Sequence, residues 1–170
     1  LFFWYVSARP LPESITYGMS FNAPYAEELG LNPYEVLTAL IDDLGIRHFR
    51  LAAHWNRVEE TRDVYNFTEL DRELALIEKR GGTVIFGVGR RLPRWPECHV
   101  PSWGKDLSWE EQKQEIRDLI TTVVNRYKES NAITYWQVEN EPYLTVFATE
   151  HCGETLDQSF LEEEIALVKA

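Results

Sequence analysis

The strongest constraint on the fold is a pattern that recurs four times: a short apolar run followed by an amphipathic helical stretch. The apolar runs are residues 15–21, 46–53, 83–88 and 133–138. The third run, TVIFGV, is almost wholly apolar and rich in β-forming residues, as expected of a strand covered on both faces. Strands that alternate with helices predict a parallel sheet with right-handed crossover connections.

Capping residues predict where the intervening helices begin. Asn32, followed by proline, is the expected N-cap of the first helix, and Thr68 is the expected N-cap of the second. Ser108 with Glu111 has the capping-box pattern for the third helix. A last helix is predicted at about 156–169.

Two α/β architectures fit this alternation: a doubly wound open sheet and a (β/α)₈ barrel. The turn after the first apolar run reads SFNAPY and has no glycine-rich phosphate loop, so the barrel is favoured. A complete barrel takes about 250 residues. The 170 residues of this chain therefore predict the N-terminal half of a barrel, with about four βα units, and suggest a truncation.

Residues 1–14 are set apart from the domain at 15–170. The run LFFWYV is strongly apolar, and the chain begins without Met. This run is either the cut end of a signal peptide or anchor, or a first strand or docking arm. The first alternative predicts an extracellular or cell-surface protein. The run is too short for stable membrane insertion, and 9–14 is a Pro-rich linker.

Charge and metal-ligand patterns exclude several kinds of partner. The formal net charge is −11, which disfavours nucleic acid. The histidines show no HExxH spacing, so no metal or other cofactor is expected. Cys98 and Cys152 are in loops after the third and fourth apolar runs, and whether they form a bridge is left open. The oligomeric state is not predicted.

Functional residues of a (β/α)₈ barrel lie at the carboxyl ends of its strands and in the loops that follow. The fourth apolar run ends as YWQVENEPY, and Pro142 interrupts regular pairing there. Glu141 is thereby expected at the barrel rim, where burial and a second carboxylate raise the pKa of a general acid. Asn140 and Glu141 can both face a ligand only if the strand breaks at this point.

These residues resemble the clan A glycoside hydrolases, from about Tyr17 to the end of the chain. The resemblance is carried by FRLAAHW, VYNFTELD, LPRWPE and the Asn-Glu-Pro sequence. It implies that Glu141 is the general acid/base, that Asn140 hydrogen-bonds the sugar 2-hydroxyl, and that Arg50 orients the nucleophile.

The resemblance also implies a retaining reaction, in which two carboxyl groups lie about 5–5.5 Å apart. The family's nucleophile is a Glu at the end of the seventh strand, beyond the last residue here. We therefore expect a retaining glycoside hydrolase of a β-linked polysaccharide or glycoside that is inactive as this fragment. The alternative is a catalytically inactive carbohydrate-binding barrel or a truncated fragment.

Further side chains at the same edge are candidates for substrate binding. Trp55 and Trp95 either stack on sugar rings or pack inside loops. His54 is a candidate too, although packing behind the site is its favoured role, and the remaining candidate is Tyr143. Many family members have a His after the third strand, where this chain has Arg90 and Arg91, interpreted as solvated loop charges or an acceptor subsite.

Overall fold

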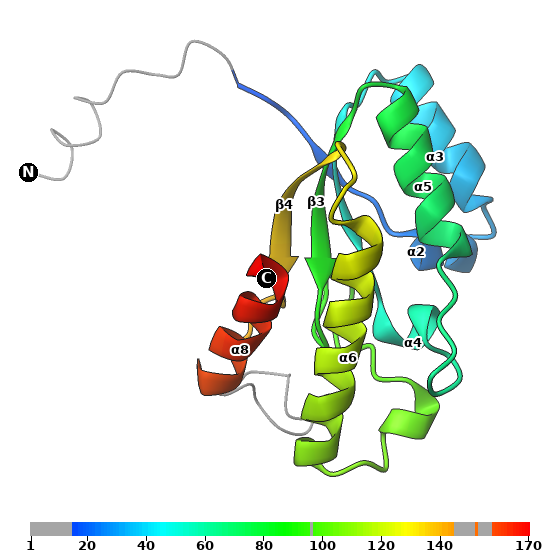
Figure 1. The fold of residues 1–170 in the computed structure, drawn as a ribbon. Helices are drawn as coiled ribbons and strands as arrows, with labels where there is room; N and C mark the ends of the chain where they lie inside the picture. The colour runs from blue at the N-terminus through cyan, green and yellow to red at the C-terminus, as the bar shows by residue number, and fades with distance from the viewer. Residues whose placement is uncertain (1–14, 96, 145–151, 153–157) are drawn as a thin grey trace, which may run out of the picture.

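The computed structural model describes residues 15–95, 97–144, 152 and 158–170 (Figure 1). Within them, four strands form one parallel sheet. The strands are β1 (Met19–Ser20), β2 (His48–Ala52), β3 (Thr83–Val88) and β4 (Ile133–Val138). Their spatial order, β1-β2-β3-β4, is the order in the sequence. All four carboxyl ends therefore meet at one edge, as they do in half of a (β/α)₈ barrel.

The helices are α2 (Ala23–Glu28), α3 (Pro33–Asp42), α4 (Trp55–Val58), α5 (Thr68–Lys79), α6 (Trp109–Tyr127), α8 (Gln158–Lys169) and the 3₁₀ turn Ser102–Gly104. The core lies between these helices and one face of the sheet, where Phe49, Leu51, Val84 and Phe86 are buried. Alternate strand residues point to opposite faces, so their neighbours along each strand face away from the helices.

Among the described residues, no helix covers the other face of the sheet. Arg50 is in register with Ile85, which is in register with Tyr135, so the three form a row across β2, β3 and β4. Ile85 and Tyr135 are exposed there, and Ser20 of β1, in register with Arg50, lies in the same row. In a closed barrel this face points to the interior.

The predicted α/β half barrel is confirmed, and β3 and β4 have the predicted bounds. The first strand is shorter than expected, two residues rather than 15–21, because only Met19 and Ser20 pair with β2. The segment 1–14 lies outside the described residues. No helix in the described part of the chain has the length and apolar character needed to span a membrane.

Candidate active site

The end of β4 contains a sharp backbone turn. Glu139 has φ 60° and Glu141 has φ 48°, both in the left-handed region that side chains other than glycine rarely adopt. The Glu139 amide donates to the Val88 carbonyl at 2.9 Å, and the Asn140 amide donates to the Arg91 carbonyl at 2.7 Å. The turn therefore breaks the regular alternation of β4 while staying attached to the loop after β3. Glu141 is left exposed at the carboxyl edge.

The buried carboxylate of Glu139 anchors this turn. Its two oxygens accept hydrogen bonds from the backbone amides of Arg90, at 2.5 Å, and Arg91, at 2.6 Å. Gly89, at φ 124°, has no room for a Cβ because the Glu139 carboxyl occupies that space. Burial raises the pKa of Glu139, and the two backbone donors act in the opposite direction. Glu139 thus has a structural role rather than a substrate-facing one.

Glu164 of α8 is a second buried carboxyl near Glu139. Burial, and secondly the charge of Glu139, raise the pKa of Glu164 to about 10. Both effects favour the protonated, neutral form of Glu164, which avoids a second buried negative charge beside Glu139.

A chain of side-chain hydrogen bonds connects the predicted site residues on β2 and β4. Arg50 donates from Nη1 to Oε1 of Gln137 at 3.4 Å and from Nε to Oγ of Ser20 at 3.0 Å. Gln137 donates from Nε2 to Oδ1 of Asn140 at 3.3 Å. Arg50 and Asn140, far apart in sequence, are therefore linked through one amide side chain, beside Glu141 at the same edge.

Glu97, in the loop after β3, is a site residue that the sequence analysis did not single out. Its Oε1 accepts a hydrogen bond from Nδ2 of Asn140 at 2.9 Å, and its Oε2 lies 3.7 Å from a guanidinium nitrogen of Arg91. Burial, and then the neighbouring charge of Glu141, raise the pKa of Glu97. The available signal was its place in the LPRWPE sequence, but only the folded loop shows which residues it touches.

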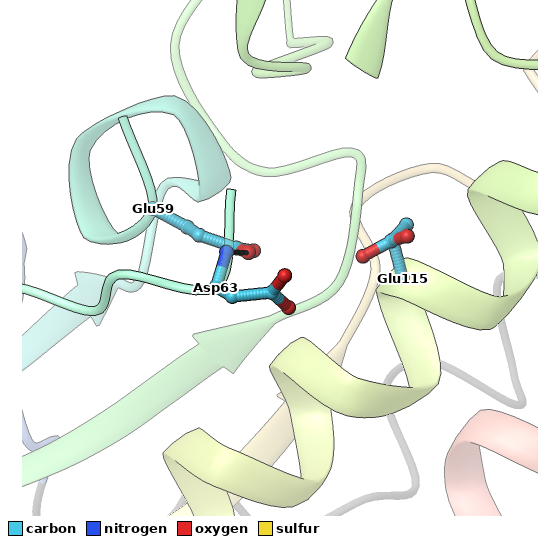
Figure 2. A group of neighbouring side chains, drawn as sticks. All are labelled: Glu59, Asp63 and Glu115. Atoms are coloured by element: carbon cyan, nitrogen blue, oxygen red, sulfur yellow. Dashed lines mark hydrogen bonds between the residues drawn. The ribbon is translucent and has the colours of Figure 1, made fainter. Parts of the chain in front are cut away.

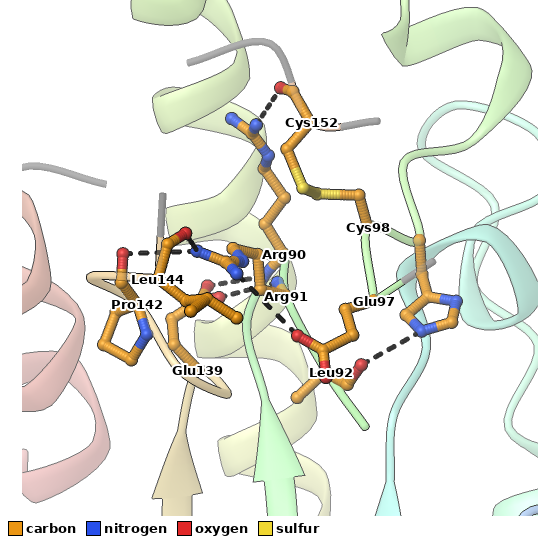
Figure 3. Close-up of a disulfide and its surroundings, with 10 residues drawn as sticks. Arg90, Arg91, Leu92, Glu97, Cys98, Glu139, Pro142, Leu144 and Cys152 are labelled. Carbon is orange, nitrogen blue, oxygen red and sulfur yellow. Dashed lines mark hydrogen bonds and ion pairs between the residues drawn. A yellow bond between two sulfur atoms is a disulfide. The ribbon is translucent and has the colours of Figure 1, made fainter. Parts of the chain in front are cut away.

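A disulfide joins the segments that follow β3 and β4 (Figure 3). Cys98 and Cys152 are paired, with Cα atoms 5.5 Å apart, which answers a question that the sequence left open. The adjacent Arg90 side chain donates to the Cys152 carbonyl. The loop carrying Glu97 is thereby fixed to the chain beyond the β4 turn.

The interpretation of Arg90 and Arg91 as solvated loop charges or subsite residues is wrong. They are only 1% and 2% exposed. Nη1 of Arg91 donates to the carbonyls of Pro142, at 3.3 Å, and Leu144, at 3.2 Å (Figure 3). Both arginines thus connect the loop after β3 to the chain that follows β4.

The structure gives the predicted aromatic and histidine ligands different surroundings. Trp55 is 0% exposed and donates from Nε1 to Glu59, so it packs inside the protein rather than against a sugar. His54 is also buried and bonds the Pro93 carbonyl at 3.1 Å, and burial lowers its pKa to about 3. For Trp55 the alternative of sugar stacking is therefore wrong and packing is its role, and His54, a substrate-binding candidate, has the packing role that the sequence favoured. Trp95 and Tyr143, each 58% exposed, remain candidates.

One group of carboxylates in the described chain is close enough to be tested as a metal site (Figure 2). Glu59, Asp63 and Glu115 each offer an oxygen, and these oxygens lie within 4.8 Å of one another. Glu59 already accepts hydrogen bonds from Trp55 and from the Asp63 amide, and Arg62 pairs with Glu115. Since protein donors already bind Glu59 and a cation already pairs with Glu115, we assign no metal to this group.

Four parallel strands in barrel order, with Asn-Glu-Pro at the end of β4, define the class: a clan A glycoside hydrolase barrel. Solved structures share this fold. GH5_18 from Streptomyces cattleya has a TM-score of 0.64 and 12% identity, covering 92% of this chain and 41% of that one. Xylanase10C from Cellvibrio japonicus has a TM-score of 0.62 and 16% identity, covering 93% and 34%.

The family follows from the sequence. Residues 49–163 match the family model of Glycosyl hydrolase family 10, and the chain belongs to this family. A curated relative, the Beta-glucosidase-like SFR2, chloroplastic, of Oryza sativa subsp. japonica, is 29% identical over 122 residues. That match covers 67% of this chain and 18% of the relative, so the chain spans less than a fifth of the relative's length.

Proposed function

We propose that this chain supplies the acid/base half of the active site of a retaining glycoside hydrolase acting on a β-linked polysaccharide or glycoside. The observation that carries the proposal is the left-handed turn after β4, which leaves the Glu141 carboxyl exposed at the carboxyl edge of a parallel sheet. Strand ends at this edge are where (β/α)₈ enzymes place their reacting groups. Family membership supports the same reaction class.

In the proposed reaction, Glu141 protonates the glycosidic oxygen while a second carboxylate, from the later half of the barrel, attacks the anomeric carbon. The carbon–oxygen bond to the leaving group breaks, and a glycosyl-enzyme forms. Glu141 then takes a proton from water, whose oxygen attacks the same carbon and releases the second carboxylate. Asn140 donates a hydrogen bond to the sugar 2-hydroxyl, and Arg50 orients the attacking carboxylate.

The test is the variant Glu141→Ala in a protein that contains this chain together with the rest of the barrel. Loss of a general acid slows cleavage of poor leaving groups by roughly 10²- to 10⁴-fold. Aryl β-glycosides with an activated leaving group, such as dinitrophenolate, need no protonation, so their first step is largely spared. Added azide, which needs no general base, restores the second step and yields a β-glycosyl azide.

Glu129→Ala is the matched control, since Glu129 is an exposed carboxylate in the turn after α6, away from the carboxyl edge. Its rates are expected to equal those of the parent. An E141A protein that loses the same factor with good and poor leaving groups, without azide rescue, contradicts the acid/base assignment. Sugar binding without turnover in the parent protein identifies a carbohydrate-binding barrel instead.

A further inference from the structure

We propose that Glu97 is a positioning residue for Asn140, fixing which end of the Asn140 amide is presented to the substrate. This inference rests on the proposed function and adds a residue from the loop after β3 to it. Glu97 reaches Asn140 directly, with 2.9 Å between Oε1 and Nδ2. It acts on the sugar only through Asn140.

The direction of the hydrogen-bond chain is set by charged groups at its two ends. A guanidinium can only donate, so the contact with Arg50 requires Gln137 to present Oε1 and leaves its Nε2 to donate. Gln137 therefore requires Oδ1 of Asn140 as its acceptor. Nδ2 of Asn140 is then left for Glu97, which as a carboxylate can only accept.

The second hydrogen bond of Gln137 supports the same orientation. Its Nε2 also donates to the main-chain carbonyl of Glu139 at 2.9 Å. Reversing the Asn140 amide would place its Nδ2 against this donor and its Oδ1 against a carboxylate. A donor–donor contact and an acceptor–acceptor contact would replace two hydrogen bonds. The series of hydrogen bonds therefore allows one orientation of the Asn140 amide.

Glu97 is itself held in place from several sides. Arg91 lies 3.7 Å from Oε2. The backbone of Glu97 is in the left-handed region at φ 67°, and its amide donates to the Arg94 carbonyl at 2.7 Å. The next residue, Cys98, is in the disulfide with Cys152. The acceptor for Asn140 is thus fixed before a substrate arrives.

A fixed Asn140 amide matters because a sugar hydroxyl can both donate and accept. With Oδ1 held by Gln137 and one N–H held by Glu97, the second N–H of Asn140 is the remaining donor. A donor whose orientation is set in advance costs no reorganisation when charge develops at the sugar. Truncating Glu97 would leave the orientation to the weaker contact with Gln137 alone.

The test is a double-mutant cycle in the protein that contains the whole barrel, with Glu97→Ala, Asn140→Ala and the combination. The probe is whichever p-nitrophenyl β-xyloside, β-glucoside or β-galactoside the protein cleaves, with its 2-deoxy counterpart. Loss of a hydrogen bond to a charged group predicts a fall in kcat/KM of about tenfold for E97A. E97Q, whose amide oxygen still accepts, is expected to fall less.

Two features separate positioning from a merely structural role. The E97A penalty should vanish in the N140A background, and it should vanish with the 2-deoxy substrate. Equal penalties in both backgrounds and on both substrates overturn the proposal. Glu129→Ala, which removes an exposed carboxylate, should leave every rate unchanged.

Failure of this proposal is distinguishable from failure of the proposed function. If E141A loses activity and E97A does not, the reaction stands and the positioning role fails. If the protein turns over none of these probes, a high-resolution crystal structure of E97A decides, since Asn140 should then lose its single orientation. If the Asn140 side chain keeps a single orientation in E97A, the proposal is overturned. If the alanine variant does not fold, E97Q replaces E97A in all comparisons.

Discussion

At the scale of single residues, Glu139 shows how a buried charge can hold a site without taking part in its chemistry. A carboxylate removed from water is costly unless hydrogen-bond donors replace the lost hydration. Here the backbone amides of Arg90 and Arg91 do so. The same contact sets the geometry of the β4 turn, because Glu139 immediately precedes Asn140.

Gly89→Ala tests this arrangement. A Cβ at residue 89 would overlap the Glu139 carboxyl, and φ 124° is itself strained for alanine. We expect the free energy of unfolding to fall by about 3 kcal/mol or more. Gly30→Ala is the control, since φ there is 74° with nothing within 4 Å of the added carbon, and about 1 kcal/mol is expected. If urea denaturation shows the same decrease in the free energy of unfolding for both variants, the predicted overlap with the Glu139 carboxyl is contradicted.

Glu164→Gln should change how stability depends on pH. The folded pKa of Glu164, about 10, is above the ordinary value of 4.5 for a glutamate side chain, so the folded state keeps a proton that the unfolded state loses between these two pH values. The contribution of Glu164 to the free energy of unfolding is therefore fully present below pH 4.5. It decreases by about 1 kcal/mol per pH unit as the pH rises toward 10.

Glutamine mimics the protonated form, so the variant should show a flatter decline from pH 6 to 9 in thermal unfolding, with Glu163→Gln as the exposed neighbour for comparison. A decline as steep as that of the parent would mean that Glu164 does not hold its proton.

At the scale of elements, helix starts differ in whether a side chain caps them. Ser108 accepts from the Glu111 amide, and Glu111 bonds back to the Ser108 amide, completing the predicted capping box of α6. The prediction of Thr68 as the N-cap of α5 is wrong, because Phe67 holds that position and no side-chain cap bond is present.

We therefore expect Ser108→Ala to lower the free energy of unfolding by about 1 kcal/mol and Thr68→Ala to change it by a few tenths. Chemical denaturation of the two variants side by side measures the difference. Similar losses from both would indicate that helix propensity, rather than capping, sets these start sites.

The elements that sequence could predict are those defined by local patterns. β3 and β4 follow from runs of apolar residues, and Asn140 with Glu141 follows from the place of a short motif after a strand. Glu97 could not be found this way, because its role comes from contacts with residues 91 and 140, reached only after the sheet forms. Trp55 was misplaced because α4, a single turn, turns it inward, and nothing local distinguishes a buried tryptophan from an exposed one.

At the scale of the whole molecule, the open sheet is the main feature. β1 and β4 are the edges of the described sheet, and in the described part of the chain Ile85 and Tyr135 are exposed on one face of it. Unpaired edges and apolar faces favour association. We expect the 170-residue chain expressed alone to hydrolyse no aryl β-glycoside and to elute as oligomers in size-exclusion chromatography. A cooperatively folding monomer with turnover would contradict this.

The disulfide gives a second prediction at this scale. In protein purified without reductant, thiol titration should find Cys98 and Cys152 oxidised. Closing a loop of this kind stabilises a fold by about 2–4 kcal/mol, so reduction should lower the melting temperature. Free thiols in protein taken from its native compartment would contradict the pairing, and would count against the extracellular or cell-surface location that the signal-peptide alternative predicts.

The contact between Glu139 and the two amides after Gly89 has a consequence for ionic conditions. Consecutive backbone amides that converge on one point form the kind of cradle in which other proteins capture phosphate or sulfate from solution. Here the occupant is covalently part of the chain, so the turn that presents Glu141 does not depend on any anion in the medium. Because the Glu139 carboxylate belongs to the same chain as the two amides, dilution or dialysis of the protein cannot remove it from them.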